Sequence, residues 1–254
     1  MKERIIGIMG AMPEEIDSIR QLLSEESRVT IGMRTYSTGK LNGIRAVVVF
    51  SRWGKVAASI TVSTLILEFK VTELIFTGVA GAIDPQLRIG DIVLGRRLIQ
   101  HDMDARPLME QFEIPLLGKT FFECAAEQLE PAAKAIGDLL EKNHLHAAIR
   151  SGELDKFGIA VPRLFVGDIA SGDKFFANTR DKDHLLAALP SVLCVEMEGA
   201  AVAQVCYEYD IPFTIIRTIS DGADEKSHID FPSFIKEISS KYSLEIVKII
   251  YAAG

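Results

Sequence analysis

The sequence predicts an α/β fold in which a central, mostly parallel mixed sheet is flanked by helices. Several short runs are almost continuously apolar rather than alternating, as in strands that are covered on both faces. Segments with helical spacing lie between these runs, and an alternation of strands and helices favours a parallel sheet. The predicted strands are Arg4–Gly10, Ala46–Ser51, Glu73–Val79, Asp91–Leu94, Leu164–Ala170, Val192–Val195 and Phe213–Ile219.

The segment Pro13–Leu23 illustrates the helical pattern. Proline stands in its first turn, two carboxylates follow, and Ile16 and Ile19 have the spacing of one helix face. The stretches 103–121 and 143–163 are less regular. Because strands of the buried type lie on both sides of 143–163, we interpret it as an irregular insertion within a single domain of residues 1–254. The other predicted helices are Val56–Phe69, Glu123–Lys142, Ala200–Tyr209 and Phe234–Tyr251.

The composition excludes several classes of protein. The chain has 254 residues, 48% hydrophobic and 25% charged, and can bury a core without disulfides or a metal. The net charge is −7, and no run of Lys and Arg predicts a nucleic-acid partner. No apolar stretch approaches the roughly 20 residues of a membrane span. The three cysteines are scattered and have no metal-ligand spacing with histidine, so we expect reduced thiols, no metal and a cytoplasmic location.

Polar and glycine-rich segments follow the predicted strands, where open α/β sheets bind ligands. Gly7 and Gly10 precede a helix, but the pattern Gly-x-Gly-x-x-Gly is absent, and Glu14 and Glu15 at the helix start would repel a pyrophosphate. We therefore expect no dinucleotide cofactor, and no other cofactor. The segments at strand ends are Gly10–Glu15, Thr77–Gly81, Ser171–Asp173, Val195–Gly199 and Arg217–Asp221.

Acidic residues at three strand ends carry the chemical prediction. Glu196 and Glu198 are two positions apart, so in an extended segment they share a face, and burying them unpaired would be costly. Taken singly, Glu15 is explained as a partner of the helix dipole, and Asp221 as a helix cap or loop acid. Together the acids suggest cleavage of a ribose–purine bond, in which one acid assists the departing base, one activates water and one holds the sugar.

At the level of motifs, the chain resembles the methylthioadenosine/S-adenosylhomocysteine nucleosidases. The resemblance covers most of residues 4–250 and implies a single-domain nucleoside phosphorylase/hydrolase fold. It also implies a homodimer that hydrolyses the N-glycosidic bond of adenine thionucleosides. The matching motifs, in chain order, are IIGIMGAMPEEI, GKVAAS, FTGVAGAI, GDIVL, QHDMDA, ASGDKFF, VEMEGAAVAQVC, IPFTIIRTISDGAD and SHIDFPSF.

The resemblance also implies roles for polar residues. Glu15 matches the acid that positions and deprotonates the attacking water, and Asp221 matches the acid that contacts adenine N7 and the exocyclic amine. Ser220 stands beside Asp221. Glu198 matches the acid that binds the 2′ and 3′ hydroxyls of ribose, and Arg217 matches a residue near the water.

Apolar residues complete the predicted binding site. Phe175 matches the ring that stacks on adenine, and the backbone near Phe176 recognises the edge of the base. Met12 and Phe231 match contacts to the sugar and its 5′ substituent, and Met197 lines the sugar. Without the resemblance, Phe175 and Met197 would be interpreted as core residues.

The chain departs from the family pattern in three places. Val79 stands where a serine is often found near the water and the ribose, and Trp53 stands where a small aliphatic residue is common. The stretch 143–163 is longer than usual. We include Val79, Trp53 and Glu196 among the substrate-binding residues, although Trp53 also fits a position at the edge of the core. These departures bear on the preferred 5′ substituent.

Two other functions are compatible with the same fold. A purine nucleoside phosphorylase would need cationic groups for phosphate, whereas Glu15 would repel it and only Arg52 and Arg217 are obvious nearby arginines. A non-catalytic nucleoside-binding protein would be expected to lack one of the acids, yet Glu15, Glu198 and Asp221 are all present.

Overall fold

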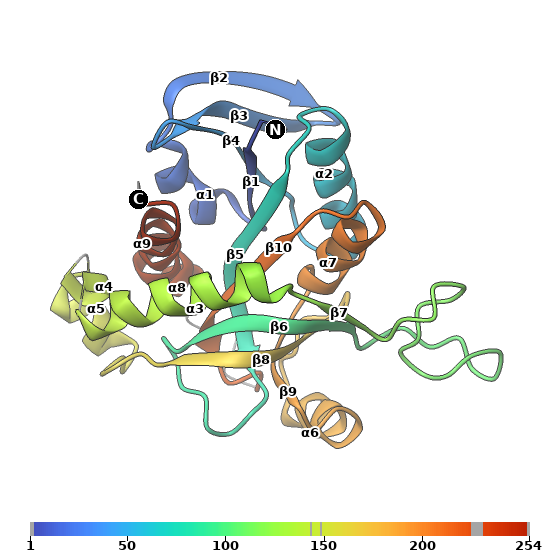
Figure 1. Ribbon diagram of the computed structural model, residues 1–254. Coiled ribbons are helices and arrows are strands. Elements are labelled where there is room, and N and C mark those ends of the chain that lie inside the picture. The colour runs from blue at the N-terminus through green and yellow to red at the C-terminus, as the bar shows by residue number, and fades with distance from the viewer. Residues whose placement is uncertain (1–2, 143, 148, 225–230, 253–254) are drawn as a thin grey trace.

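The computed structural model describes residues 3–142, 144–147, 149–224 and 231–252. Within them, ten strands form one mixed sheet in the order β10-β6-β8-β9-β5-β1-β4-β3-β2, with β7 paired to β6 and a further pairing between β10 and β5 (Figure 1). The strands are β1 (Ile5–Gly10), β2 (Ser24–Ile31), β3 (Arg34–Leu41), β4 (Ile44–Phe50), β5 (Glu73–Ala82), β6 (Ile92–Gln100), β7 (Phe121–Glu123), β8 (Leu164–Ser171), β9 (Val192–Glu196) and β10 (Phe213–Asp221).

Parallel pairing dominates the centre of the sheet. Strand β1 is parallel to β4 and β5, β5 to β10, β6 to β8, and β8 to β9. The antiparallel pairings β10–β6 and β5–β9 join this centre into a closed ring of strands. The ring brings the ends of β5, β9 and β10 together, which positions the site described below.

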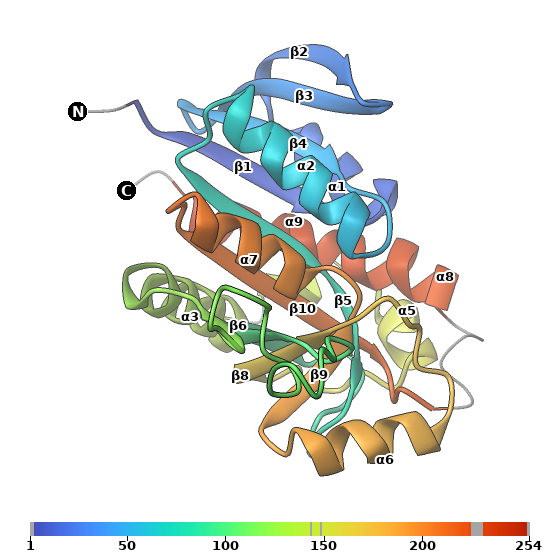
Figure 2. The same cartoon turned by 90° about the vertical axis from the view of Figure 1, so that its right-hand side faces the viewer.

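Helices cover both faces of the sheet. Helices α2 and α7 pack side by side on one face, as Figure 2 shows, and α1, α3 and α9 contribute to the core on the other. This arrangement confirms the predicted mixed α/β fold. The helices are α1 (Pro13–Arg20), α2 (Lys55–Leu67), α3 (Ala126–Glu141), α4 (His144–Ala147), α5 (Ser151–Lys156), α6 (Thr179–Ala188), α7 (Gly199–Glu208), α8 (Phe231–Phe234), a π-helix (Ile235–Ser239) and α9 (Ser240–Ile250).

The structure differs from the sequence prediction in several elements. The hairpin β2–β3 was not predicted, because β2 is an exposed edge strand and its polar sequence lacks the apolar run of a buried strand. Helix α6 was also missed. The stretch 143–163, expected to be irregular, contains the short helices α4 and α5, which place Leu145 and Leu154 in the same core cluster as α9.

Several strands are longer than predicted. Strand β5 continues past Val79 to Ala82, β6 past Leu94 to Gln100, and β10 past Ile219 to Asp221. The segments Thr77–Gly81 and Arg217–Asp221 therefore lie inside strands rather than after them, and paired neighbours hold their backbones. In the described part of the chain, no helix is both long and apolar enough to cross a lipid bilayer.

Candidate active site

All thirteen residues predicted to form the site line one cavity of about 640 Å³ that is partly open to solvent. The cavity lies at the carboxyl ends of β1, β5, β9 and β10. Phe76 and Lys174 also line it and were not among the predicted residues, although Lys174 stands directly before Phe175 in the ASGDKFF motif. The predicted residues are Met12, Glu15, Trp53, Val79, Phe175, Phe176, Glu196, Met197, Glu198, Arg217, Ser220, Asp221 and Phe231.

Glu15 lies in the first turn of α1 and is held by the short connection between β1 and this helix. Its Oε2 atom accepts hydrogen bonds from the backbone N–H groups of Ala11 (2.6 Å) and Met12 (3.0 Å). Gly10 permits this closure, since a Cβ atom there would lie 2.7 Å from Ile16 Cγ2 and 2.9 Å from Glu15 Cβ. The tight turn therefore places the carboxylate directly over the end of β1.

The environment of Glu15 favours its protonated form. Burial raises the pKa of this carboxyl to about 7, against the opposing effects of Arg217 and the two backbone N–H groups. Its Oε1 atom is buried and has no hydrogen-bond partner in the described part of the chain. A carboxyl with an unpartnered oxygen that titrates near neutrality is suited to exchange a proton with a molecule in the cavity.

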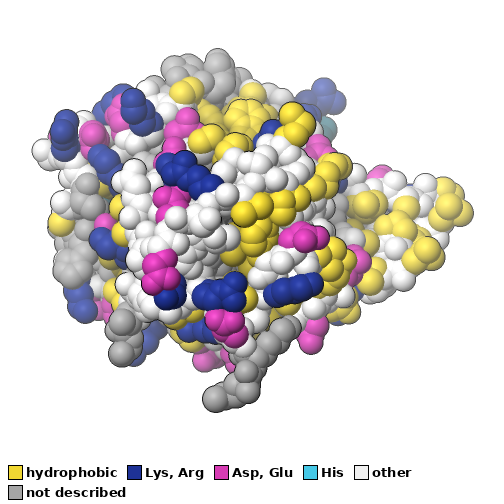
Figure 3. Space-filling view, turned by 90° about the horizontal axis from the view of Figure 1, so that it is seen from above, with side chains coloured by type: hydrophobic (Ala, Val, Ile, Leu, Met, Phe, Trp, Pro, Cys, Tyr) yellow, Lys and Arg dark blue, Asp and Glu magenta, His cyan; other side chains and the backbone are white. Residues whose placement is uncertain are grey.

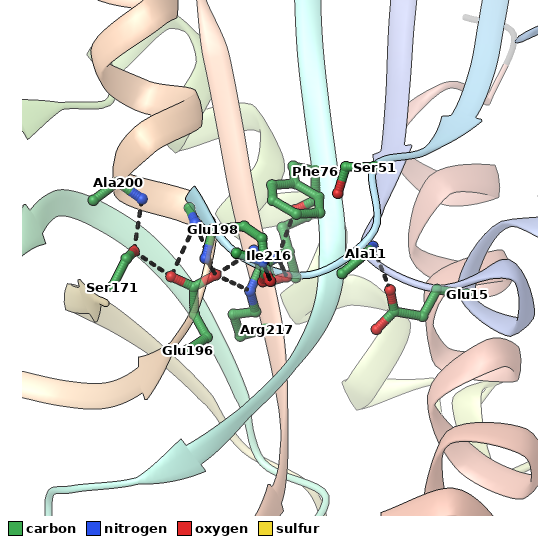
Figure 4. A network of polar contacts seen from close by, with 12 residues as sticks. Ala11, Glu15, Ser51, Phe76, Ser171, Glu196, Glu198, Ala200, Ile216 and Arg217 are labelled. Atoms are coloured by element: carbon green, nitrogen blue, oxygen red, sulfur yellow. Dashed lines mark hydrogen bonds and ion pairs between the residues drawn. The ribbon is translucent and has the colours of Figure 1, made fainter. Parts of the chain in front are cut away.

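Glu196 and Arg217 form a buried ion pair beside the cavity. The Nη2 and Nε atoms of Arg217 lie 2.8 and 3.3 Å from Glu196 Oε2, and both side chains are almost fully buried. Glu196 also accepts hydrogen bonds from the backbone N–H groups of Glu198 and Gly199 and from the Ser171 hydroxyl (Figure 4). Protein donors therefore occupy both of its oxygens, which indicates that Glu196 orients its neighbours rather than binding a ligand directly.

Arg217 is committed to protein partners as well. Its Nη1 atom donates to the carbonyl oxygens of Phe76 (3.2 Å) and Ile216 (2.9 Å), and its guanidinium lies over the Phe76 ring, 4.1 Å from the centroid. Glu196 neutralises its charge. Arg217 therefore offers little free positive charge to a bound anion.

Glu198 and Asp221 complete the acidic lining. Glu198 Oε1 accepts a hydrogen bond from Gly54 N (2.7 Å), whereas Oε2 has no hydrogen-bond partner among the described residues. Burial and the neighbouring Glu196 raise the pKa of Glu198 to about 8. Asp221 accepts hydrogen bonds from the Ser220 hydroxyl (2.7 Å) and the Ala223 backbone N–H (2.8 Å), which fix its orientation.

Aromatic side chains form the opposite wall. The Phe231 ring meets Phe175 edge-on at 5.7 Å and Trp53 at 6.4 Å between centroids. Trp53 is 58% exposed, which excludes the alternative that it packs in the core. Phe176 is buried against His101. The described part of SHIDFPSF is Phe231–Phe234, since residues 227–230 lie outside the described residues.

The site thus combines a wall of aromatic side chains with acids from α1, β9, β10 and the start of α7. An aromatic ring can receive a planar base by stacking, and the acids can exchange protons and hold hydroxyl groups. Among the described residues, no group of three or more His, Cys, Asp or Glu side chains is arranged to hold a metal ion.

Comparison with known proteins identifies the broad class to which the chain belongs. A family model described as the phosphorylase superfamily matches residues 5–251, almost the whole chain. The chain is therefore a member of this superfamily, in agreement with its mixed sheet and the position of its cavity.

Individual relatives narrow the assignment. A 5′-methylthioadenosine/S-adenosylhomocysteine nucleosidase from Geobacillus thermodenitrificans is 35% identical over 241 residues, which cover 94% of this chain and 93% of the relative. The solved S-adenosylhomocysteine nucleosidase of Streptococcus pyogenes, in complex with 5-methylthiotubericidin, matches with a TM-score of 0.83 and 30% identity, and covers 98% and 97% of the two chains. The futalosine hydrolase of Helicobacter pylori matches with a TM-score of 0.81 and 30% identity, over 97% of both chains. Within the superfamily, the chain belongs to the 5′-methylthioadenosine/S-adenosylhomocysteine nucleosidase family.

Proposed function

We propose that this protein hydrolyses the N-glycosidic bond of adenine thionucleosides such as 5′-methylthioadenosine and S-adenosylhomocysteine, releasing adenine and the thioribose. The observation that carries the proposal is the buried carboxyl of Glu15, a residue that lines the cavity: its Oε1 has no hydrogen-bond partner among the described residues, and burial raises its pKa to about 7. A general base is most effective when it titrates near the working pH. The names of the relatives support the same reaction.

The geometry supports a role for each acid in this reaction. In its ionised form, Glu15 accepts a proton from water as the water attacks the anomeric carbon. Asp221, oriented by Ser220 and Ala223, donates in its protonated form the proton that adenine takes up at N7 as the bond to the sugar breaks, so that adenine leaves as a neutral molecule. Glu198 presents Oε2 to the ribose hydroxyls, and Phe175 stacks on the base. These roles favour the transition state because charge on the sugar and the base develops only as the bond breaks.

Water is favoured over phosphate as the nucleophile. The carboxylates of Glu15, Glu198 and Asp221 line the cavity, and Glu196 neutralises the nearby cation Arg217. Lys174 lines the cavity too, but its ammonium group is paired with Asp181 at 2.7 Å. The cavity therefore offers a phosphate dianion little free positive charge, and Glu15 in its ionised form would repel it, whereas a water molecule is affected by neither.

The test is adenine release from 5′-methylthioadenosine in phosphate-free buffer. Adenine and free methylthioribose are the expected products. A strict requirement for phosphate with a ribose 1-phosphate product would identify a phosphorylase, and nucleoside binding without adenine release would identify a non-catalytic protein. Assays of S-adenosylhomocysteine, 5′-deoxyadenosine and aminodeoxyfutalosine under the same conditions would define the 5′ preference.

We also propose that the protein is a homodimer. The segment 103–121 projects from the body of the molecule (Figure 1), and it exposes Leu108 (88%) and Leu116 (95%). Val56 (71%) and Ile60 (49%) are exposed on α2. Figure 3 shows apolar side chains in a band across one face and on the projecting part at its right. Exposed apolar surface of this kind is typical of an interface between subunits.

Sedimentation tests the dimer. The protein should sediment as a dimer at micromolar concentration, and Leu116→Asp should shift it towards the monomer because a charge would be buried in the interface. A fully active monomer would refute the proposal.

We further propose a cytoplasmic location. Cys124, Cys194 and Cys206 are all buried and unpaired, as expected for a protein kept in a reducing compartment. Fractionation of cells that contain the protein would test it, and recovery outside the cytoplasmic fraction would contradict it.

A further inference from the structure

The segment between β4 and α2 connects the mouth of the cavity to Glu198. It carries Trp53, and the next backbone N–H, that of Gly54, donates to Glu198 Oε1 at 2.7 Å. Gly54 has φ +90°, in the region that favours glycine, and a Cβ atom there would lie 2.9 Å from Asp173 Oδ1. Glycine is therefore required for this N–H to face Glu198 while the segment passes close to Asp173.

Three charged residues, Lys55, Asp102 and Asp173, form a ring of hydrogen bonds that holds this segment on the side of β6 and β8. The backbone N–H of Lys55 donates to Asp173 Oδ1 (2.8 Å), and the Lys55 ammonium donates to Asp102 Oδ1 (2.6 Å) and Gln100 Oε1 (3.1 Å). The ring closes because the backbone N–H of Asp173 donates to Asp102 Oδ2 (2.9 Å). It joins the start of α2 to the residues that follow β6 and β8.

Arg34 holds the segment on the side of β3. Arg34, on β3, is buried and donates to the carbonyl oxygens of Ser51 (3.2 Å), Ala57 (3.3 Å) and Gly32 (3.1 Å). Because Ser51 and Ala57 lie on either side of Gly54, their bonds to Arg34 keep the segment attached to the sheet without the charged ring. The side chains of Lys55 and Asp102 are 17% and 32% exposed, and ion pairs that water reaches add little to stability.

The position of Gly54 N determines how Glu198 meets a ligand. This N–H occupies Oε1 and leaves Oε2 for the cavity. Burial, Glu196 and Glu15 raise the pKa of Glu198, whereas the Gly54 N–H and Arg217 lower it and so favour the ionised carboxylate. An ionised carboxylate accepts stronger hydrogen bonds from hydroxyl groups than a neutral one. A displaced Gly54 would leave Glu198 with another orientation and more of its neutral form.

We propose that Lys55, Asp102 and Asp173 are positioning residues for Glu198, which they orient through the Gly54 N–H. They thereby determine how strongly the enzyme prefers a ribonucleoside to an analogue that lacks a ribose hydroxyl. The inference rests on the proposed function, in which Glu198 binds those hydroxyls. None of the three needs to touch the substrate for this role.

The test compares 5′-methylthioadenosine with its 2′-deoxy and 3′-deoxy analogues in the wild type and in Lys55→Met. Each deoxy analogue lacks one hydrogen bond to the Glu198 carboxylate, so the wild type should have a kcat/KM for it that is roughly 10- to 100-fold lower than for 5′-methylthioadenosine. The discrimination ratio is kcat/KM for 5′-methylthioadenosine divided by kcat/KM for its deoxy analogue. In Lys55→Met this ratio should fall by about fivefold or more, because a misplaced Glu198 forms weaker hydrogen bonds with the hydroxyls. Lys55→Arg, which keeps the ion pair, should restore most of the ratio.

Controls separate positioning from general damage. Lys134→Met removes an exposed lysine on α3 and should leave the ratio unchanged. The thermal unfolding midpoint of Lys55→Met should stay close to that of the wild type. If Lys55→Met does not fold, Asp173→Ala removes the acceptor for Lys55 N and should lower the ratio in the same way.

Two results would overturn the inference, and they are distinguishable. An unchanged ratio in a folded Lys55→Met or Asp173→Ala protein would show that the charged ring does not position Glu198, while the proposed function would stand. A wild type that releases no adenine, or does not prefer the ribonucleoside, would overturn the proposed role of Glu198 together with this inference.

Discussion

Replacement of Glu15 by glutamine is expected to remove most of the activity and, at alkaline pH, to make the protein more stable. The ordinary pKa of this carboxyl is 4.5, and burial raises it to about 7 in the folded protein. Between these pH values, the folded protein retains a proton that the unfolded chain has lost. The resulting stabilisation is complete below pH 4.5 and is lost as the pH rises through 7.

The size of the effect follows from the two pKa values. Their difference corresponds to about 3 kcal/mol of unfolding free energy at pH 8, where the wild type must bury a charged carboxylate. Glutamine has the shape of the protonated form and never ionises. For a chain of this length, about 3 kcal/mol raises the midpoint of thermal unfolding by roughly 6–12 °C. At pH 5 the difference should shrink to less than about 1 kcal/mol.

Thermal unfolding of the wild type, Glu15→Gln and Glu14→Gln at pH 5 and pH 8 measures this effect. Glu14 is the exposed neighbour on the same helix turn, so Glu14→Gln is the matched control for the loss of one carboxyl. Adenine release by Glu15→Gln should be lower by about 10²-fold or more, as expected for the loss of a general base. A Glu15→Gln protein that is less stable than the wild type at pH 8, or whose stability difference is the same at both pH values, would refute the reasoning.

Three further substitutions test other parts of the site. Asp221→Asn should keep the fold and lower kcat by about 10²–10⁴-fold, because it weakens stabilisation of the departing adenine; a rate near the wild type would show that the role is misassigned. Glu196→Gln should cost about 3–5 kcal/mol in urea unfolding, because it leaves the buried Arg217 without its counter-ion, and a cost below about 1 kcal/mol would contradict that view. Trp53→Ile should change the ratio of kcat/KM for methylthioadenosine and S-adenosylhomocysteine several-fold. Since Trp53 is 58% exposed, its loss should cost well under the roughly 3–5 kcal/mol of a buried aromatic truncation, and an unchanged ratio with that larger cost would place it in the core.

The central strands were predictable because burial on both faces of the sheet restricts which residues a short segment can contain. Strand β1, for example, is buried along its full length and contains only apolar residues and glycine, and a short window of sequence reveals this. The opposite holds for β2, whose residues are almost all exposed. Its pairing with β3 depends on backbone hydrogen bonds, which leave no apolar pattern in the sequence.

The membership of the candidate site was also predictable, since family motifs mark the chain positions that meet at the cavity. The sequence did not reveal how the acids differ. Glu196 and Glu198 stand two positions apart with the same side chain, yet Glu196 is neutralised by Arg217, whereas Glu198 is held by Gly54 and leaves one oxygen to the cavity. Their partners lie 21 and 144 residues away along the chain, so local pattern could not assign them.

The sequence by itself determined the fold class, the family and the residues that gather around the cavity, because buried strands and strand-end motifs are encoded within short segments. Only the tertiary structure decided which carboxylates are paired with protein groups and which leave an oxygen to the cavity. It also showed that Trp53 lies at the mouth of the cavity and that Lys55, Asp102 and Asp173 close a ring beside it. These properties depend on burial and on hydrogen-bond partners from distant segments, which come together only when the closed ring of strands has formed.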